Sequence, residues 1–307
     1  MATTTEAWRP TTWLHAAALS ARLGCEVLCA SETGQHTGSF KFRAAYTVAA
    51  GVPHRHLITA SSGNFGQALA CACQQLGKAC HVVMPTTSAQ VKIDGVRGYG
   101  ATVDLIDTRH ISRAARIQEL AAHYPDAYLA SPYDDPLVIA GNASLGREIA
   151  ARAVDIDAVL CPIGGGGLAS GIVTGLQDAG IALPVWGAEP LMANDAARSL
   201  RAGHLLANEQ EPQTMADGAR TVSLGLHNWD ILQPGLAGII EVPESCIAAG
   251  VRLVYETLEL VVEPTGALTI GAILAEPERF AGRWVCCVLS GGNVDPAVHA
   301  ALLQGFD

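Results

Sequence analysis

Positive charge is scarce in this sequence. Its 19 lysines and arginines are outnumbered by 29 aspartates and glutamates, and the formal net charge is −10 at pH 7. Nucleic acids and anionic membranes attract basic surfaces, so this balance argues against both as partners. An anionic ligand would have to be held locally, by backbone N–H groups or by a few placed cations.

Long apolar runs, paired cysteine motifs and a secretion signal are also missing. The sequence has no uninterrupted apolar span of about 18 residues, so no transmembrane helix is expected. The nine cysteines lack the spacing of a zinc site, and most stand in apolar runs such as "WVCCVL", which indicates buried free thiols in a reducing compartment. The start, "MATTTEAWRPTTWLH", has no basic segment before an apolar core, so we expect a cytoplasmic protein.

What the chain does contain is an alternation of short β-branched runs with helical ones. A first series predicts strands at 56–60, 80–85, 102–107 and 127–131, with helices from about 65, near 88–98 and over 111–123. A second series predicts strands at 157–163, 184–189 and 283–289, with a helix from about 168. Repeated strand–helix units predict an α/β fold of mostly parallel sheets flanked by helices.

Two series of strands predict two lobes. We expect 53–133 to form a small domain, and 1–52 together with 134–307 to form a large one, because no linker rich in Pro, Gly and Ser separates them. Ligands of open α/β sheets bind at the carboxyl ends of strands. Three polar or glycine-rich loops follow predicted strands and should therefore lie together: "SSGN" (61–64), "GGGGLAS" (164–170) and "SGGN" (290–293).

One of only three lysines, Lys41, stands between two phenylalanines in "HTGSFKFRAA" (36–45). A solvated surface charge does not need that setting, and arginine would serve there equally well. A desolvated lysine loses its proton far more readily than an arginine does. The neutral amine is a nucleophile toward carbonyl carbon, so Lys41 is a candidate nucleophile.

The loop "IGGGGLASG" (163–171) joins a predicted strand to a predicted helix. Consecutive glycines let backbone N–H groups close around an anion at a helix N-terminus, which predicts a phosphate cradle. A dinucleotide-binding turn and a glycine turn that merely packs are the alternatives. In the other two loops, Ser61, Ser62 and Asn64 either cap a helix or bind an anion, and Ser290 is either a turn hydroxyl or a neutral ligand contact.

A nucleophilic lysine, a phosphate cradle and a polar anion loop together indicate pyridoxal phosphate. In order, "HTGSFKFRAA", "SSGNFGQA", "GGGGLASG" and "LSGGN" resemble the motifs of fold-type II pyridoxal-phosphate enzymes, over about 31–300. The chain is most similar to the serine/threonine dehydratase and serine racemase family. The resemblance implies a two-lobed fold of the tryptophan synthase β-subunit type, with the cofactor in the large domain.

The resemblance also implies roles for these residues. Lys41 would form the Schiff base and then move the Cα proton, while Phe40 would pack against the pyridine ring. Ser290 would hydrogen-bond the pyridine nitrogen, and Asn64 would contact the ring hydroxyl. The phosphate would be held by Gly164, Gly165, Gly166, Gly167 and the N–H group of Leu168. The substrate carboxylate would be held by Ser61, Ser62, Gly63 and Asn64.

Three residues bear on specificity, and one segment bears on metal binding. Ser62 would be the second acid–base group, opposite Lys41, unless it only holds a carboxylate or caps the helix. Tyr133 in "SPYDDP" would lie near the side-chain pocket, and Phe65 stands where much of the family has His. "AEPLMAND" (188–195) resembles a divalent-metal segment: Glu189, Asp195 and the carbonyl of Ala193 would bind Mg²⁺, Ca²⁺ or Mn²⁺, the alternative being a solvated acidic turn.

The implied activity is that of a pyridoxal-phosphate-dependent ammonia-lyase. It would remove water from L-threonine or L-serine, with 3-hydroxyaspartate next, and release a 2-oxo acid and ammonia. The main alternative is a serine or hydroxyaspartate racemase on the same scaffold. A β-replacement synthase ranks lower, because an acidic residue usually follows the lysine where this chain has Phe42. A non-catalytic cofactor-binding protein is the last alternative. We expect a small amino acid as the binding partner, and a homodimer.

Overall fold

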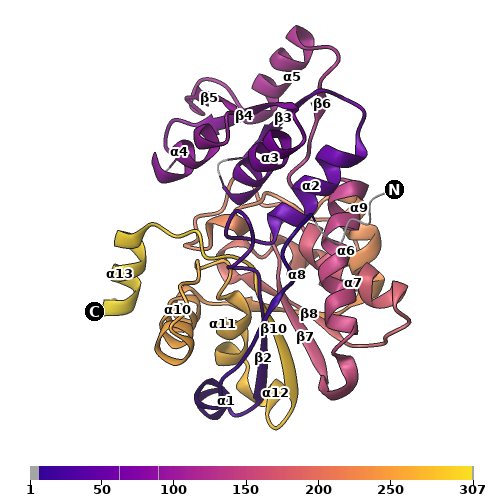
Figure 1. The fold of residues 1–307 in the computed structure, drawn as a ribbon. Helices are drawn as coiled ribbons and strands as arrows, with labels where there is room; N and C mark the ends of the chain where they lie inside the picture. The colour runs from indigo at the N-terminus through magenta and orange to yellow at the C-terminus, as the bar shows by residue number, and fades with distance from the viewer. Residues whose placement is uncertain (1–6, 62, 89, 306–307) are drawn as a thin grey trace.

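The structure is a computed structural model that describes residues 7–61, 63–88 and 90–305, and it has two separate sheets (Figure 1). The larger sheet has six strands in the order β1-β2-β10-β7-β8-β9, and all neighbours are parallel except the β1–β2 pair. Its strands are β1 (Thr12–His15), β2 (Glu26–Ser31), β7 (Ala158–Pro162), β8 (Val185–Pro190), β9 (Leu236–Val242) and β10 (Trp284–Leu289).

The smaller sheet has four parallel strands in the order β5-β4-β3-β6. Its strands are β3 (His56–Ala60), β4 (Ala79–Pro85), β5 (Thr102–Ile106) and β6 (Tyr128–Leu129). Parallel neighbours need a crossover connection, and helices supply it between each of these strands and the next. The predicted α/β class with two mostly parallel sheets is confirmed.

Helices cover the sheets and connect their strands. The first part of the chain forms α1 (Ala17–Leu23), α2 (Lys41–Gly51), α3 (Asn64–Gln75), α4 (Gln90–Gly98), α5 (Arg113–His123) and α6 (Pro136–Ala150). The second part forms α7 (Gly167–Asp178), α8 (Asp195–Ala202), α9 (Leu226–Gly235), α10 (Glu244–Leu258), α11 (Leu268–Ala275), α12 (Pro277–Phe280) and α13 (Pro296–Gln304). Short 3₁₀ turns are η2 (Ala153–Asp155), η3 (Leu191–Ala193) and η4 (Asp217–Ala219).

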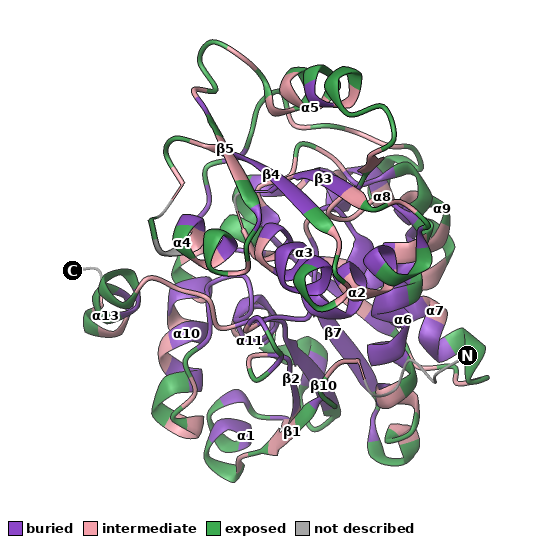
Figure 2. Cartoon of the chain, turned by 45° about the horizontal axis from the view of Figure 1, so that its top comes forward, coloured by how far each residue is buried: buried purple, intermediate pink, exposed green. Residues whose placement is uncertain are grey.

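The central strand β10 shows why its sequence is apolar throughout. Val285, Cys287 and Leu289 belong to the core on the side of α10 and α11, whereas Cys286 and Val288 belong to the core on the side of α7. A strand covered on both faces buries the side chains on both, and every β10 residue except the exposed Trp284 is buried, so "WVCCVL" is a continuous apolar run (Figure 2). All nine cysteines are free, and eight of them are buried.

Some elements were not predicted from the sequence, among them β1, β2, β9 and the helix α2. Helix α2 carries Lys41 at its first residue, and its Phe42, Ala45 and Val48 pack into the same core cluster as Leu69 of α3. The helix therefore joins the core beside the smaller sheet, although it precedes residue 53 in the chain. The exact division into domains stays a prediction. Within the described ranges, no helix is long and apolar enough to span a membrane.

Candidate active site

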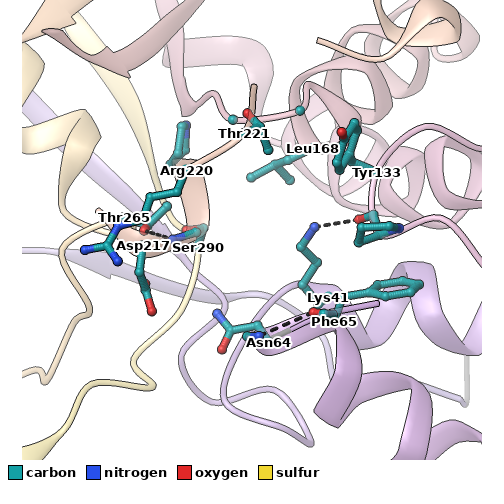
Figure 3. Close-up of a pocket in the computed structure, with 18 of the residues that line it drawn as sticks. Lys41, Asn64, Phe65, Tyr133, Leu168, Asp217, Arg220, Thr221, Thr265 and Ser290 are labelled. Carbon is teal, nitrogen blue, oxygen red and sulfur yellow. Dashed lines mark hydrogen bonds between the residues drawn. The ribbon is translucent and has the colours of Figure 1, made fainter. Parts of the chain in front are cut away.

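A cavity of about 400 Å³ lies where β3, β7 and β10 end, between segments of the two sheets (Figure 3). It gathers residues that are far apart in the sequence, as the strand-end rule for α/β sheets predicts. Of the predicted site residues, those that line it are Phe40, Lys41, Ser61, Gly63, Asn64, Tyr133, Gly164, Gly165, Gly166, Gly167, Leu168 and Ser290. Ser62, the predicted second acid–base residue, lies outside the described residues.

Lys41 reaches into this cavity from the first residue of α2 (Figure 3). Its Nζ donates a hydrogen bond to the carbonyl oxygen of Pro132 at 2.7 Å and lies 5.1 Å from the ring centre of Phe40 and 5.7 Å from that of Phe65. Burial lowers the pKa of Lys41 to about 8, and the carboxyl group of Glu263 opposes this shift only in part. A substantial fraction of this amine is therefore neutral near pH 8.

The two other lysines are engaged elsewhere. Lys78 donates to the carbonyl oxygens of Ala49 and Val52 at the end of α2. Lys92 forms an ion pair with Asp217 at the edge of the cavity. Neither has the apolar setting of Lys41, so Lys41 stays the predicted nucleophile.

The glycine loop after β7 ends at the N-terminus of α7. Gly166 has φ of +94°, a left-handed conformation that glycine adopts without strain. A Cβ on Gly165 would lie 2.2 Å from the ring of Tyr133, so no side chain fits there. Asn228 donates to the carbonyl oxygen of Gly165, and Asn142 to that of Gly167.

This arrangement suits an anion. The carbonyl oxygens of Gly165 and Gly167 accept hydrogen bonds from amide side chains. The first N–H groups of a helix have no partner inside the helix, so those of α7 are available to an anion. The positive end of the α7 dipole adds to the attraction. Close packing against Tyr133 also requires glycine in this loop. The run of glycines is therefore explained by both the anion cradle and the packing.

Two polar side chains at strand ends face the same space. Ser290 follows β10, is 1 % exposed, and its Oγ has no hydrogen-bond partner in the described chain. Asn64 begins α3 and is held at both ends: its Nδ2 donates to Glu263 Oε1 at 2.7 Å, and its Oδ1 accepts from Asn293 Nδ2 at 2.9 Å. A buried hydroxyl without a partner is costly unless a ligand satisfies it.

Several cavity residues were missed in the sequence. Glu263 in "VVEPTGA" is a buried carboxyl group in the cavity wall. At the rim, Arg113 pairs with Glu211 at 2.5 Å, while Arg220 donates its Nε to the carbonyl oxygen of Thr214. The sequence signal for Glu263 is weak: it is a single charged residue that directly follows two valines in "VVEP" (261–264).

The three predicted metal ligands do not line this cavity: Glu189 lies at the end of β8, Ala193 in η3 and Asp195 at the start of α8. Glu189 accepts hydrogen bonds from the backbone N–H groups of Ala196 and Ala197, and Asp195 Oδ1 accepts one from Asn208. Asp195 Oδ2 is buried without a partner in the described chain. Burial and the Asp195 charge raise the pKa of Glu189, and burial raises the pKa of Asp195 to about 7.

A divalent cation would offset the repulsion between the Glu189 and Asp195 carboxylates. Mg²⁺, Ca²⁺ and Mn²⁺ prefer oxygen donors such as these. Among the described residues, no group of three or more His, Cys, Asp or Glu side chains could hold a metal ion. The site therefore consists of two carboxylates and a backbone carbonyl, and its metal stays a prediction.

The cavity has the donor set that pyridoxal phosphate requires. Lys41 supplies an amine whose pKa is lowered, the loop at α7 supplies an anion cradle, and Ser290 supplies a buried unpaired hydroxyl. Phe40 adds an apolar ring beside the amine. The residues present thus fit this group.

Comparison with known proteins agrees with this fit. The profile of the family described as "Pyridoxal-phosphate dependent enzyme" matches residues 4–291. The L-threo-3-hydroxyaspartate ammonia-lyase of Saccharomyces cerevisiae is 33% identical over 291 residues, which cover 94% of this chain and 89% of that protein. The serine racemase of Bos taurus is 33% identical over 274 residues, which cover 86% of this chain and 81% of the racemase.

Among solved structures, the threonine deaminase of T.th. matches with a TM-score of 0.88 and 39% identity over 95% of both chains. The chain belongs to the family of pyridoxal-phosphate-dependent enzymes. Pyridoxal phosphate is its cofactor, and a dinucleotide-binding role for the glycine loop is set aside.

Proposed function

We propose that this protein is an ammonia-lyase that removes water from a β-hydroxy-α-amino acid, with L-threonine and L-serine as the leading substrates. The observation that carries the proposal is the buried Lys41 amine, which shares one cavity with the anion cradle and with the unpaired Ser290 hydroxyl. The relatives with ammonia-lyase and threonine deaminase activity support the same reaction class.

When bound, pyridoxal phosphate supplies an electron sink for negative charge at the substrate Cα. The Lys41 amine takes the Cα proton, because burial keeps part of it neutral at working pH. The β-hydroxyl group leaves as water with one added proton, which balances the proton that Lys41 removes from Cα. The enamine product then adds water and releases ammonia, which leaves the 2-oxo acid.

Other residues position the reactants. The phosphate would lie in the loop 164–167 at the start of α7, and Ser290 would contact the ring nitrogen as a neutral hydroxyl. A neutral partner does not stabilise a charged ring, so negative charge stays available at Cα and elimination of the β-hydroxyl is favoured over transamination. The substrate carboxylate would lie at the start of α3, near Ser61 and Gly63. Phe65 offers no donor there, so backbone N–H groups supply that contact.

A second substrate, 3-hydroxyaspartate, is supported by the cations of the cavity. Lys92 and Arg113 are each paired with a carboxylate, but Arg220 is in no ion pair within the described chain. The neighbouring Thr221 Oγ1 is buried and also has no partner there. A guanidinium without an acidic partner, beside an unpaired hydroxyl, is suited to a second carboxylate on the substrate.

A panel of hydroxy-amino acids, assayed for 2-oxo acid and ammonia, tests both substrates. Arg220→Met should lower kcat/KM for 3-hydroxyaspartate by about 10- to 100-fold, the loss expected of a hydrogen bond to a charged group, and should leave L-threonine turnover nearly unchanged. An equal loss of kcat/KM on both substrates would show that Arg220 does not recognise the substrate side chain. No turnover of any β-hydroxy-amino acid would overturn the proposed function.

A racemase remains the alternative activity, and the serine racemase relative supports it. It differs from the lyase in needing an acid–base group on each face of the substrate. Chiral analysis of L-serine incubated with the protein separates the two, because only a racemase yields D-serine. We also propose a homodimer, which light scattering of the purified protein would test.

A further inference from the structure

Glu263 is a buried carboxyl group in the wall of the cofactor cavity, and the roles proposed above do not use it. The residue is 2 % exposed and lines the cavity with Lys41 and Ser290. Its Oε1 accepts the 2.7 Å hydrogen bond from Asn64, whereas its Oε2 is buried and has no partner in the described chain. The chain thus keeps an unpaired acidic oxygen inside its active site.

The surrounding backbone is shaped to hold this carboxyl group. Glu263 donates its N–H to the carbonyl oxygen of Gly291, in the "SGGN" loop. A Cβ on Gly291 would lie 2.7 Å from Glu263 Oε1 and 2.9 Å from Ser39 Cβ, so glycine leaves room for both side chains. The close approach of Glu263 is therefore one of the steric reasons for a glycine at position 291.

The charge state of Glu263 is set by burial and by groups from four other segments. Burial is the largest effect, and the pKa of Glu263 is raised to about 8. Asp217 of η4 also raises this pKa, while Lys92 of α4, the hydrogen bond from Asn64 of α3 and Lys41 of α2 lower it without offsetting burial. At neutral pH this side chain is a neutral acid, so it can donate a hydrogen bond as well as accept one.

Asn64 depends on this acid for its orientation. Its Nδ2 donates to Glu263 and its Oδ1 accepts from Asn293, whose Nδ2 also donates to the carbonyl oxygen of Thr37. With both ends fixed, the amide cannot turn over without breaking two bonds. The second N–H of Asn64 Nδ2 then keeps a fixed direction for a ligand.

We propose that Glu263 is a positioning residue of the cofactor site, which acts as a neutral acid to hold the Asn64 amide and to present an O–H donor from Oε2 to the cavity. The inference rests on the cofactor assignment of the proposed site and is independent of the substrate. Both tests below measure stability or cofactor binding, so they succeed or fail whichever amino acid is turned over.

The first test follows the proton. A native carboxyl group that keeps its proton makes the folded state lose stability as the pH rises from the unfolded pKa of about 4.3 toward about 8. Glu263→Gln removes this titration, so its urea midpoint should rise relative to the wild type between pH 5 and pH 8, with the cofactor removed from both. Glu211→Gln, which removes a half-exposed carboxyl group at the rim of the same cavity, is the matched control for the loss of one carboxyl group. If the urea midpoints of Glu263→Gln and of the wild type change in parallel with pH, the proposal that Glu263 is a neutral acid is wrong.

The second test measures cofactor affinity by titrating pyridoxal phosphate into the full-length protein. Glu263→Leu should weaken binding by about 10-fold, the loss of roughly one hydrogen bond, whereas Glu263→Gln should restore it because an amide also accepts from Asn64 and donates from the other end. In an Asn64→Ala background, Glu263→Leu should add little, since the two residues act together. Fully additive losses would show that Glu263 does not act through Asn64. If Glu263→Leu does not fold, the pH test with Glu263→Gln decides alone.

Discussion

At the scale of single residues, burial decides what Lys41 can do. The side chain is buried beside two aromatic rings, and this burial lowers its pKa to about 8 although the carboxyl group of Glu263 opposes the shift. The usual value for lysine is about 10.4. The same ammonium on the surface would be almost fully charged at pH 8 and hence a poor nucleophile.

This shift predicts how the cofactor adds to the protein. Only the neutral amine attacks, so the rate at which pyridoxal phosphate reacts with cofactor-free protein should rise with pH to a midpoint near 8. Stopped-flow absorbance of the bound cofactor measures it, and a midpoint near 10 would contradict the prediction. Borohydride reduction followed by peptide mapping should mark Lys41, and Lys41→Ala should lose turnover. A mark on Lys78 or Lys92 would show that the nucleophile was misassigned.

Ser62 carries the second residue-scale prediction, which rests on the sequence alone because this residue is outside the described ranges. If Ser62 is the acid–base group opposite Lys41, then Ser62→Ala should abolish exchange between enantiomers and keep a good part of L-elimination. Chiral chromatography and a 2-oxo acid assay on both proteins give the answer. Interconversion at the wild-type rate in the variant would exclude Ser62 from that role.

At the scale of elements, the turn between β8 and α8 holds two buried acids close together. Glu189 binds the first N–H groups of α8, a favourable place for negative charge, yet Asp195 Oδ2 has no partner among the described residues. Burial raises the pKa of both carboxyl groups, and the Asp195 charge raises that of Glu189 further. A cation bound between them would offset both effects.

A metal at this turn predicts a change in stability. Addition of Mg²⁺, Ca²⁺ or Mn²⁺ at 100 times its Kd should stabilise the protein by about 2.7 kcal/mol, and a chelator should reverse the effect. The double variant Glu189→Gln and Asp195→Asn keeps the shape of both side chains and should abolish the response. Thermal melting of both proteins with and without metal measures this. An equal response of the two proteins would rule out the assigned ligands.

At the scale of the whole molecule, one buried arginine connects parts that belong to different cores. Arg43 of α2 is fully buried, and both oxygens of Glu32, just after β2, accept its hydrogen bonds at 2.7 and 2.9 Å. Glu148 of α6 accepts a third at 2.6 Å. The network ties the helix that carries Lys41 to the larger sheet.

Removal of this guanidinium should be costly. Arg43→Met leaves Glu32 buried without its partner, which predicts a loss of about 3–5 kcal/mol in the free energy of unfolding. Arg22→Met is the matched control, because Arg22 pairs with Glu256 on the surface, where a salt bridge contributes about 0–1 kcal/mol. Urea unfolding of both variants gives the comparison. Similar losses would mean that the buried network adds no more than a surface pair.

The strands of both series could be predicted from the sequence because their apolar runs are local signals. The run "HLITA" forms β3, and "WVCCVL" forms β10, within a residue of the predicted bounds. β9 was missed, since "LAGIIEV" contains glycine and a charge and its strand lies at the sheet edge. Edge strands bury less and so keep a weaker pattern.

For the site, the sequence by itself determined the cofactor. Each of its two main signals, Lys41 between two phenylalanines and the glycine loop 164–167, is formed by residues adjacent in the chain. Only the tertiary structure decided the pairing of Asn64 with Glu263, which are 199 residues apart. It also decided that Lys92 and Arg113 have acidic partners, whereas Arg220 has none within the described chain. Burial and partner distance set the charge and orientation of these groups, and both arise only when distant segments pack together.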